Sequence, residues 1–127
     1  MALHAFRSAA TWEDLVTVFS RPSNLAKKLP PEAAGGRVWP SLFVVEAETV
    51  LYEAWSAAAG QVAGLAATGS YTEALAALAG LRPAVDRYFA DVLVMADDEA
   101  VRHNRLRQLA AIAATVRTIA HLDVLQG

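Results

Sequence analysis

Apolar residues recur three and four positions apart along most of this 127-residue chain, the spacing that places side chains on one face of an α-helix. The first such stretch follows Thr11-Trp12-Glu13-Asp14, where a hydroxyl and nearby carboxylates predict a capping box. The apolar spacing continues to Leu29, but Pro22 interrupts it. Because proline has no amide proton to donate, we expect a kink or a new helix start near Arg21.

Proline and glycine then mark a loop and the end of a second helix. Residues 30–36 contain two prolines and two glycines, and Pro40 extends this irregular region. Apolar spacing predicts the next helix from about Ala47 to Ala67. Gly69 ends that helix, because glycine readily adopts the left-handed conformation that follows many helices.

Further helices are predicted in the C-terminal half of the chain. Ser70 with Glu73 indicates a second capping box, which opens a short helix to about position 79. Pro83 suits the first position of the helix that follows. Asp97-Asp98-Glu99 place negative charge at the amino end of a final helix, where the helix dipole favours it. The spacing therefore predicts helices throughout, with no alternation typical of strands.

Composition favours one compact domain over residues 1–127. The chain is 55% hydrophobic and 19% charged, and it contains no cysteine, which excludes a disulfide scaffold and a thiolate metal site. No apolar run reaches the roughly 18 residues that would span a membrane, and the first residues lack the features of a signal peptide. We therefore expect a soluble, cytoplasmic, all-α helical bundle of about five helices.

The charges are distributed unevenly. Residues 1–40 carry five basic and three acidic side chains, residues 41–100 carry two and nine, and residues 101–127 carry four and one. If the first and last helices are neighbours in space, one face of the bundle would attract phosphates while the other stays acidic.

Signals for catalysis or cofactor binding are missing from the pattern. His4, His103 and His121 lack the spacing of metal ligands, so we expect no metal site. Neither G-x-x-x-x-G-K nor G-x-G-x-x-G occurs, and the paired acids at 97–98 are explained by the helix dipole. We expect no catalytic residue and no cofactor within this chain.

One motif points to a known family. The stretch from Tyr88 to Leu106 contains Glu99-Ala100-Val101-Arg102, which resembles the D-A-L-R tetrapeptide of anticodon-binding domains found in several class I aminoacyl-tRNA synthetases and in the glycyl β subunit. Val94-Met95-Ala96-Asp97-Asp98 and the following Asn104-Arg105-Leu106 are similar to the glycyl β version.

A second set of segments resembles the same β subunits in the same order. Phe19-Ser20-Arg21-Pro22-Ser23-Asn24-Leu25 is similar to F-K-R-V-x-N-I, although Ser20 replaces a lysine and Pro22 an aliphatic residue. The other matching segments are 41–43, 50–54, 71–75 and 81–86. The resemblance thus covers nearly the whole chain.

This resemblance implies a function in tRNA recognition. It implies a non-catalytic domain that binds the anticodon arm of glycine tRNA, taken from the larger β subunit of a glycine–tRNA ligase whose α subunit carries out ATP-dependent aminoacylation. Contacts with the α subunit would then run through the rest of the β subunit, with neither DNA nor membrane as a partner. Two alternatives stay open: the equivalent domain of another D-A-L-R synthetase, such as the arginyl enzyme, and a helical protein-docking module.

Arg21, Asn24 and Lys28 are predicted to share one helical face, with Lys27 beside it. Cations bind phosphates and an amide can read a base edge, so we interpret this face as a candidate RNA contact. The alternative is an ordinary solvated face.

Arg102, Arg105 and Arg107 are candidate RNA contacts on the final helix. Arg102 could equally pair with an acid three or four residues earlier. Arg105 could reach Asp86 or Asp91 of the preceding helix instead of a phosphate. Arg107 is interpreted as a solvated charge able to touch RNA.

Trp39 and Phe43 are the aromatic residues that we consider for stacking with unpaired anticodon bases. The alternative is that both fill the interior of the bundle. Trp55, Tyr52, Tyr88 and Phe89 fall at core spacing and are interpreted as packing residues.

Overall fold

The computed structural model describes the chain from residue 9 to 31 and from 36 to 126, with side chains described for 13–31 and 36–121. These residues form helices and no strand, which confirms the predicted all-α class. The elements are α2 (Ala9–Ala26), the 3₁₀ helix η1 (Pro40–Leu42), α3 (Glu46–Ala67), α4 (Tyr71–Ala79), α5 (Arg82–Asp91) and α6 (Glu99–Gln126).

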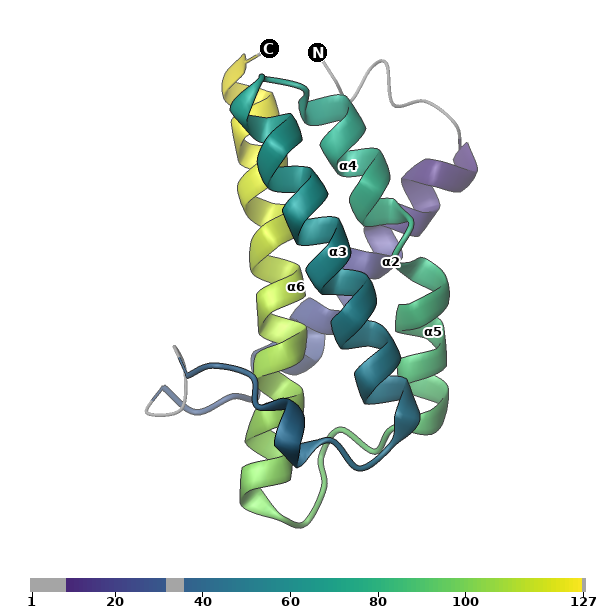
Figure 1. Cartoon of the computed structure of the whole chain (residues 1–127), viewed down its shortest axis with the longest axis vertical. Coiled ribbons are helices and arrows are strands. Elements are labelled where there is room, and N and C mark those ends of the chain that lie inside the picture. The colour runs from purple at the N-terminus through teal and green to yellow at the C-terminus, as the bar shows by residue number, and fades with distance from the viewer. Residues whose placement is uncertain (1–8, 32–35, 127) are drawn as a thin grey trace.

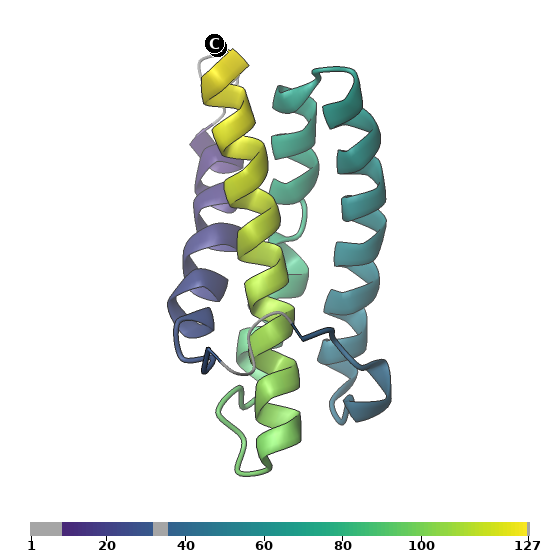
Figure 2. The same ribbon diagram turned by 90° about the vertical axis from the view of Figure 1, so that its left-hand side faces the viewer.

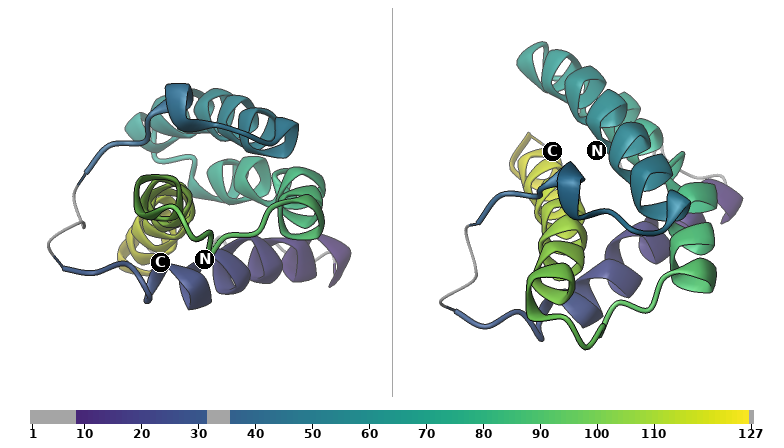
Figure 3. Two further views of the ribbon diagram at one scale, coloured as in Figure 1. Left: turned by 90° about the horizontal axis from the view of Figure 1, so that it is seen from below. Right: turned by 60° about the horizontal axis from the view of Figure 1, so that its bottom comes forward.

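The helices pack as a bundle in which α6 is the longest member (Figure 1). Helices α4 and α5 follow one another along one side of the bundle, α3 lies in front of them, and α2 crosses behind (Figure 1). The view from below separates α3 from α2, with α4, α5 and α6 between them (Figure 3). The most extensive contact between helices is that of α2 with α6, so the first and last described helices are neighbours.

Apolar side chains from every helix meet in one core. Val18 of α2, Leu51 of α3, Leu75 of α4, Val85 of α5 and Leu109 of α6 are all fully buried there. This core is the consequence of the apolar spacing seen in the sequence, because each helix buries the stripe that its own pattern produces.

Helix α2 differs from the prediction at two positions. It runs without interruption across Pro22, so the expected new start near Arg21 is wrong. Thr11 lies inside α2 and not before it, so the predicted capping box is wrong as well. Pro22 is buried within α2, where its ring nitrogen cannot donate the hydrogen bond that an amide at this position would make to the carbonyl of Val18.

The other boundaries agree closely with the pattern. Gly69 has a φ of 75° directly after α3 and its Thr68 cap, as predicted for a helix terminator. Ser70 precedes α4 as expected, but its hydroxyl contacts that of Thr68 at 3.1 Å instead of capping the helix. Asp98 accepts a hydrogen bond from the amide of Val101 at 3.0 Å, which caps α6. Pro83 is the second residue of α5, one position later than predicted.

Among the described helices, none combines the length and the apolar character that a membrane crossing requires.

Candidate nucleic-acid interface

The packing of α2 on α6 gathers the cationic parts of the chain on one side. Residues 15–31, 36–45 and 100–121 carry three, one and four Lys or Arg residues, and none of these three segments contains Asp or Glu. In the view down onto α6, α2 lies beside it and the segment that leads to η1 passes in front (Figure 2). The acidic middle of the sequence forms α3, α4 and α5 instead. The condition on which the predicted cationic side depended, that the first and last helices be neighbours, is therefore met.

Lys27 and Lys28 lie just beyond the end of α2. The helix stops at Ala26, and the amide of Lys28 donates to the carbonyl of Leu25 at 2.9 Å in the turn that follows. The prediction that Lys28 continues the helical face of Arg21 and Asn24 is therefore wrong, because the α-helix ends two residues before Lys28. Both lysines and Asn24 are exposed.

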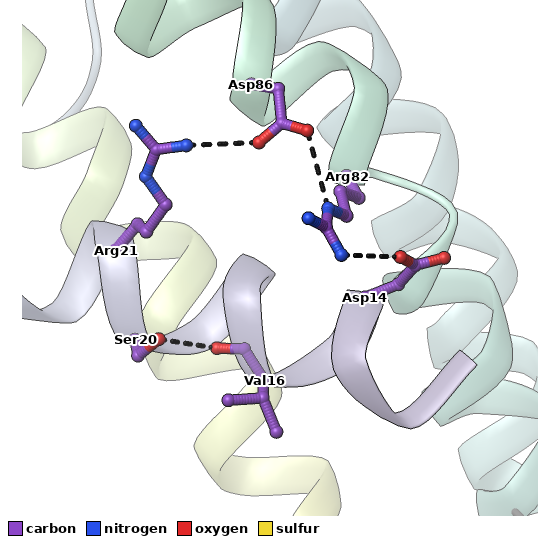
Figure 4. A network of polar contacts seen from close by, with 6 residues as sticks. All are labelled: Asp14, Val16, Ser20, Arg21, Arg82 and Asp86. Carbon is purple, nitrogen blue, oxygen red and sulfur yellow. Dashed lines mark hydrogen bonds and ion pairs between the residues drawn. The ribbon is translucent and has the colours of Figure 1, made fainter. Parts of the chain in front are cut away.

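Arg21 belongs to a network of ion pairs between α2 and α5 (Figure 4). Its guanidinium contacts one oxygen of Asp86 at 3.1 Å and lies 4.5 Å from the centre of the Phe89 ring. The other oxygen of Asp86 accepts from Arg82 at 3.4 Å, and Arg82 also donates to Asp14 at 2.9 Å. The hydrogen bond to Asp14, with a further contribution from Asp86, raises the pKa of Arg82 above its ordinary value. Arg21 thus remains partly exposed but already has an anionic partner.

Trp39 is held in an exposed position by Asn104. The side-chain amide of Asn104 donates to the Trp39 carbonyl at 3.0 Å, and its oxygen accepts from the Trp39 amide at 2.7 Å. Asn104 itself is buried, whereas Trp39 is 45% exposed. The guanidinium of Arg37 stacks on the indole at 4.3 Å from the ring centre. One buried amide therefore fixes the backbone of a loop that presents an aromatic ring and a cation to solvent.

Phe43 occupies a different environment although it lies only four residues further on. Its ring is half-buried and meets the edge of Tyr52 with 5.5 Å between ring centres. Tyr52 in turn lies against Trp55. Phe43 therefore packs onto α3, which is the alternative that the sequence left open, and Trp39 is the member of the pair that faces outward.

Arg102 folds back onto the loop between α5 and α6. Its guanidinium donates to the carbonyl of Ala96 at 2.9 Å and to that of Asp97 at 3.3 Å. None of the ion pairs between described residues joins Arg102 to Asp98 or Glu99. These hydrogen bonds stabilise the loop, and because Arg102 is only half-buried, part of its side chain still faces solvent.

Arg107 lies against the loop that leads to Trp39. Its guanidinium comes so close to Gly36 that a Cβ at this position would clash with the Nε atom. A larger residue at position 36 would therefore displace the flexible Arg107 side chain from this place. Arg107 is half-buried beneath the loop, and is not the fully solvated charge that the sequence suggested.

Arg105 is an internal residue. Its Nε atom pairs with a carboxylate oxygen of Glu48 on α3, and its Nη1 atom donates to the carbonyl of Leu93 at 2.6 Å. The Arg105 side chain is 7% exposed and that of Glu48 is fully buried. The second oxygen of Glu48 accepts from the amide of Val44 at 2.9 Å. The expected partners Asp86 and Asp91 are wrong, and burial leaves Arg105 unable to reach a phosphate at the surface.

Large apolar side chains are exposed at the end of the bundle where α3 and α6 begin. Val44 is 74% exposed and Leu93 71% exposed, and Met95 is also exposed. Val44 precedes α3, and the other two lie in the α5–α6 loop at the bottom of Figure 1. Single exposed apolar residues are ordinary on protein surfaces and need no further role.

The sequence analysis assigned no individual role to four residues that the structure shows to matter. The roles of Asn104 and Glu48 could not be predicted, because their hydrogen-bond partners lie 65 and 57 positions away in the sequence. Arg37 stands two residues before Trp39, a spacing that could have indicated stacking. Arg117 completes the cationic side of α6, and its guanidinium lies 5.7 Å from the centre of the Phe19 ring.

Comparison with known proteins gives matches to one family. The family described as the DALR anticodon binding domain matches residues 17–124. The glycine–tRNA ligase beta subunit of Desulforudis audaxviator is 44% identical over 122 residues, covering 96% of this chain and 17% of that protein. The corresponding subunit of Myxococcus xanthus is 35% identical over 126 residues, covering 99% of this chain and 18% of that protein. That of Pseudoalteromonas translucida is 41% identical over 125 residues, with coverage of 98% and 18%. The chain thus spans less than a fifth of the length of these relatives.

Proposed function

This chain belongs to the family of DALR anticodon-binding domains, and we propose that it binds the anticodon arm of glycine tRNA. The observation that carries the proposal is the meeting of the acid-free, cationic segments of the chain on the α2–α6 side, next to the exposed Trp39. Phosphates supply a large part of RNA-binding affinity, and unpaired bases stack on aromatic rings. This side of the bundle offers both kinds of contact.

The cations are assigned different roles in RNA binding according to how exposed each one is. Lys27 and Lys28 are exposed beyond α2, and Arg37 is exposed on the indole of Trp39, so these three hold phosphates in our proposal. Arg102 and Arg107 support the loops beside them and add positive charge behind the bound strand. Trp39 stacks with an unpaired base. Asn24 offers an exposed amide able to donate and accept towards a base edge.

In the parent protein this domain would serve a glycine–tRNA ligase. The names of the relatives favour glycine over the arginyl alternative, and the family favours tRNA binding over a protein-docking module. We propose that the domain positions the tRNA in the cytoplasm while an α subunit, reached through the rest of the β subunit, performs ATP-dependent aminoacylation. No residue described here is assigned to that chemistry.

The proposal is tested by titrating the anticodon-arm stem–loop of glycine tRNA with this chain. Replacing Lys27 and Lys28 together by alanine should weaken binding about tenfold or more and flatten its dependence on salt, because two phosphate contacts are lost. The matched control is Arg87→Ala, which removes a cation from α5 where Glu46 and Asp91 pair with it. A control loss of half the binding free energy lost in the double variant, in proportion to the one charge removed, would show that RNA is attracted by overall charge and not by this side of the bundle.

A further inference from the structure

A hollow between α2 and α6 lies on the cationic side, apart from Trp39. It has a volume of about 240 Å³ and is lined by two cations and four small residues: Ser23, Ala26, Lys27, Ala110, Ala113 and Arg117. Lys27 follows the end of α2 and Arg117 belongs to α6, and the small residues leave the space between these two cations open. Two cations around an open space form an arrangement that suits the binding of an anionic group.

Among the residues whose side chains the structure describes, no acid pairs with either cation. None of the ion pairs between described residues involves Lys27 or Arg117, and the segments 15–31 and 100–121 around them contain no Asp or Glu. Arg117 is oriented by the ring of Phe19, which supports its guanidinium without supplying a negative charge. Within the described part of the chain, both side chains are therefore available to an anion that enters the hollow.

The chemistry of the hollow fits a phosphate. A guanidinium can donate two parallel hydrogen bonds to phosphate oxygens, and an ammonium group adds a compact positive charge. Ser23 brings a hydroxyl to the same hollow. Ala110 and Ala113 offer no polar group, so recognition would rest on charge and shape and not on base identity.

We propose that this hollow seats a backbone phosphate of the RNA bound by the domain, an inference that rests on the proposed function. Arg117 stands 13 residues beyond Asn104 on α6, which is about 20 Å along the helix axis. The residues of α6 that line the hollow, from Ala110 to Arg117, thus begin about 9 Å along the axis from Asn104. The RNA strand runs along α6, with unpaired bases at its amino-terminal end and a phosphate held nearer its middle.

The test uses the same stem–loop RNA, measured by fluorescence anisotropy over a range of salt. Arg117→Ala should weaken binding about five- to tenfold and lower the slope of log affinity against log salt by about one contact, or roughly 0.7 to 0.9. Arg117→Lys keeps the charge and should lose less. Circular dichroism of each variant confirms that the helices are retained.

A second set of variants leaves both cations in place. Ala110→Glu puts a carboxylate into the hollow and should weaken binding more than Ala110→Gln, which adds the same bulk without the charge. Ala57→Glu is the distant control, because it adds one negative charge at an exposed position of α3. In the RNA, a neutral methylphosphonate is placed at one linkage at a time. One linkage should weaken binding of the parent chain and have little effect on Arg117→Ala.

The outcomes separate the two proposals. If the parent chain binds the stem–loop but Arg117→Ala and Ala110→Glu bind equally well with the same salt slope, the hollow holds no phosphate. If the parent chain does not bind even at low salt, the proposed function fails and the seat fails with it.

Discussion

Asn104 and Trp39 lie 65 positions apart in the sequence, yet the amide of one makes two hydrogen bonds, of 2.7 and 3.0 Å, to the backbone of the other. This pairing ties the loop before η1 to the first turns of α6. The loop is thereby fixed while its indole stays exposed. A fixed aromatic ring loses little conformational freedom when a base stacks on it, which favours binding.

Replacing Asn104 by alanine should therefore act on both stability and RNA binding. Loss of the two hydrogen bonds should lower the free energy of unfolding by about 1–2 kcal/mol. RNA affinity should fall towards that of Trp39→Ala, and the double variant should bind no worse than Trp39→Ala alone, because both changes remove the same contact. Urea unfolding and RNA anisotropy measure the two effects. Gln61→Ala, which removes an exposed amide from α3, is the control.

The buried pair of Arg105 and Glu48 should show strong coupling in a double-mutant cycle. Glu48→Gln or Arg105→Met alone should destabilise the chain by about 3–5 kcal/mol, since each leaves one buried charge without its partner. The double variant should be less destabilised than the sum of the two. Urea unfolding of the three variants provides the measurement, and strictly additive losses would contradict the buried pair.

Tyr88 should make the stability of the fold sensitive to alkaline pH. Burial, and then the negative charge of Glu48, raise the pKa of its hydroxyl above the ordinary value, whereas Arg105 lowers it. The raised folded-state pKa stabilises the fold below the unfolded-state value of about 10, and this contribution is lost as pH rises further. Urea unfolding at about pH 8 and about pH 11 should therefore show a smaller loss in Tyr88→Phe than in the parent chain.

The same substitution should do little harm near neutral pH. The Tyr88 hydroxyl is buried and has no hydrogen-bond partner among the described residues. Its removal should leave the free energy of unfolding within about 1 kcal/mol of the parent value, or raise it. Tyr52→Phe, which removes the hydroxyl of a half-buried tyrosine, is the matched control. A pH dependence of Tyr88→Phe identical to that of the parent would rule out Tyr88 as its source.

Asp86 should restrain RNA binding through Arg21. Its carboxylate is the anionic partner of Arg21 and also contacts Arg82. Asp86→Asn removes that negative charge, so affinity for the stem–loop at low salt should rise about two- to threefold, the size expected for an exposed pair. Asp91→Asn on the same helix is the control. Unchanged or weaker binding by Asp86→Asn would mean that Arg21 does not face the RNA.

The fold could be predicted from the sequence because its determinants are local. Apolar spacing and Gly69 define α3 to within one residue, and the acids at 97–99 mark the start of α6. Local rules failed at Thr11, which lies inside α2, and at Pro22, where the packing of α2 against α6 and α4 outweighs the preference of a single residue.

The candidate interface could be predicted only in part. The uneven charge pattern predicted a cationic side on one condition, that the first and last helices be neighbours, and the structure meets that condition. Individual roles depend on contacts between distant residues, and the sequence does not reveal these. The sequence analysis treated Arg105 as a surface cation, but its side chain is buried against Glu48. It treated Trp39 and Phe43 as equivalent, but Asn104 holds the Trp39 backbone while the Phe43 ring packs on Tyr52.

The central claim, that this side of the bundle reads the anticodon arm of glycine tRNA, is tested most directly by one binding measurement. Glycine tRNA and the same tRNA with an exchanged anticodon are titrated with this chain at two salt concentrations. We predict tighter binding of the native anticodon, with affinity for both RNAs falling as salt rises. Equal binding of the two RNAs, or none at low salt, would contradict the claim.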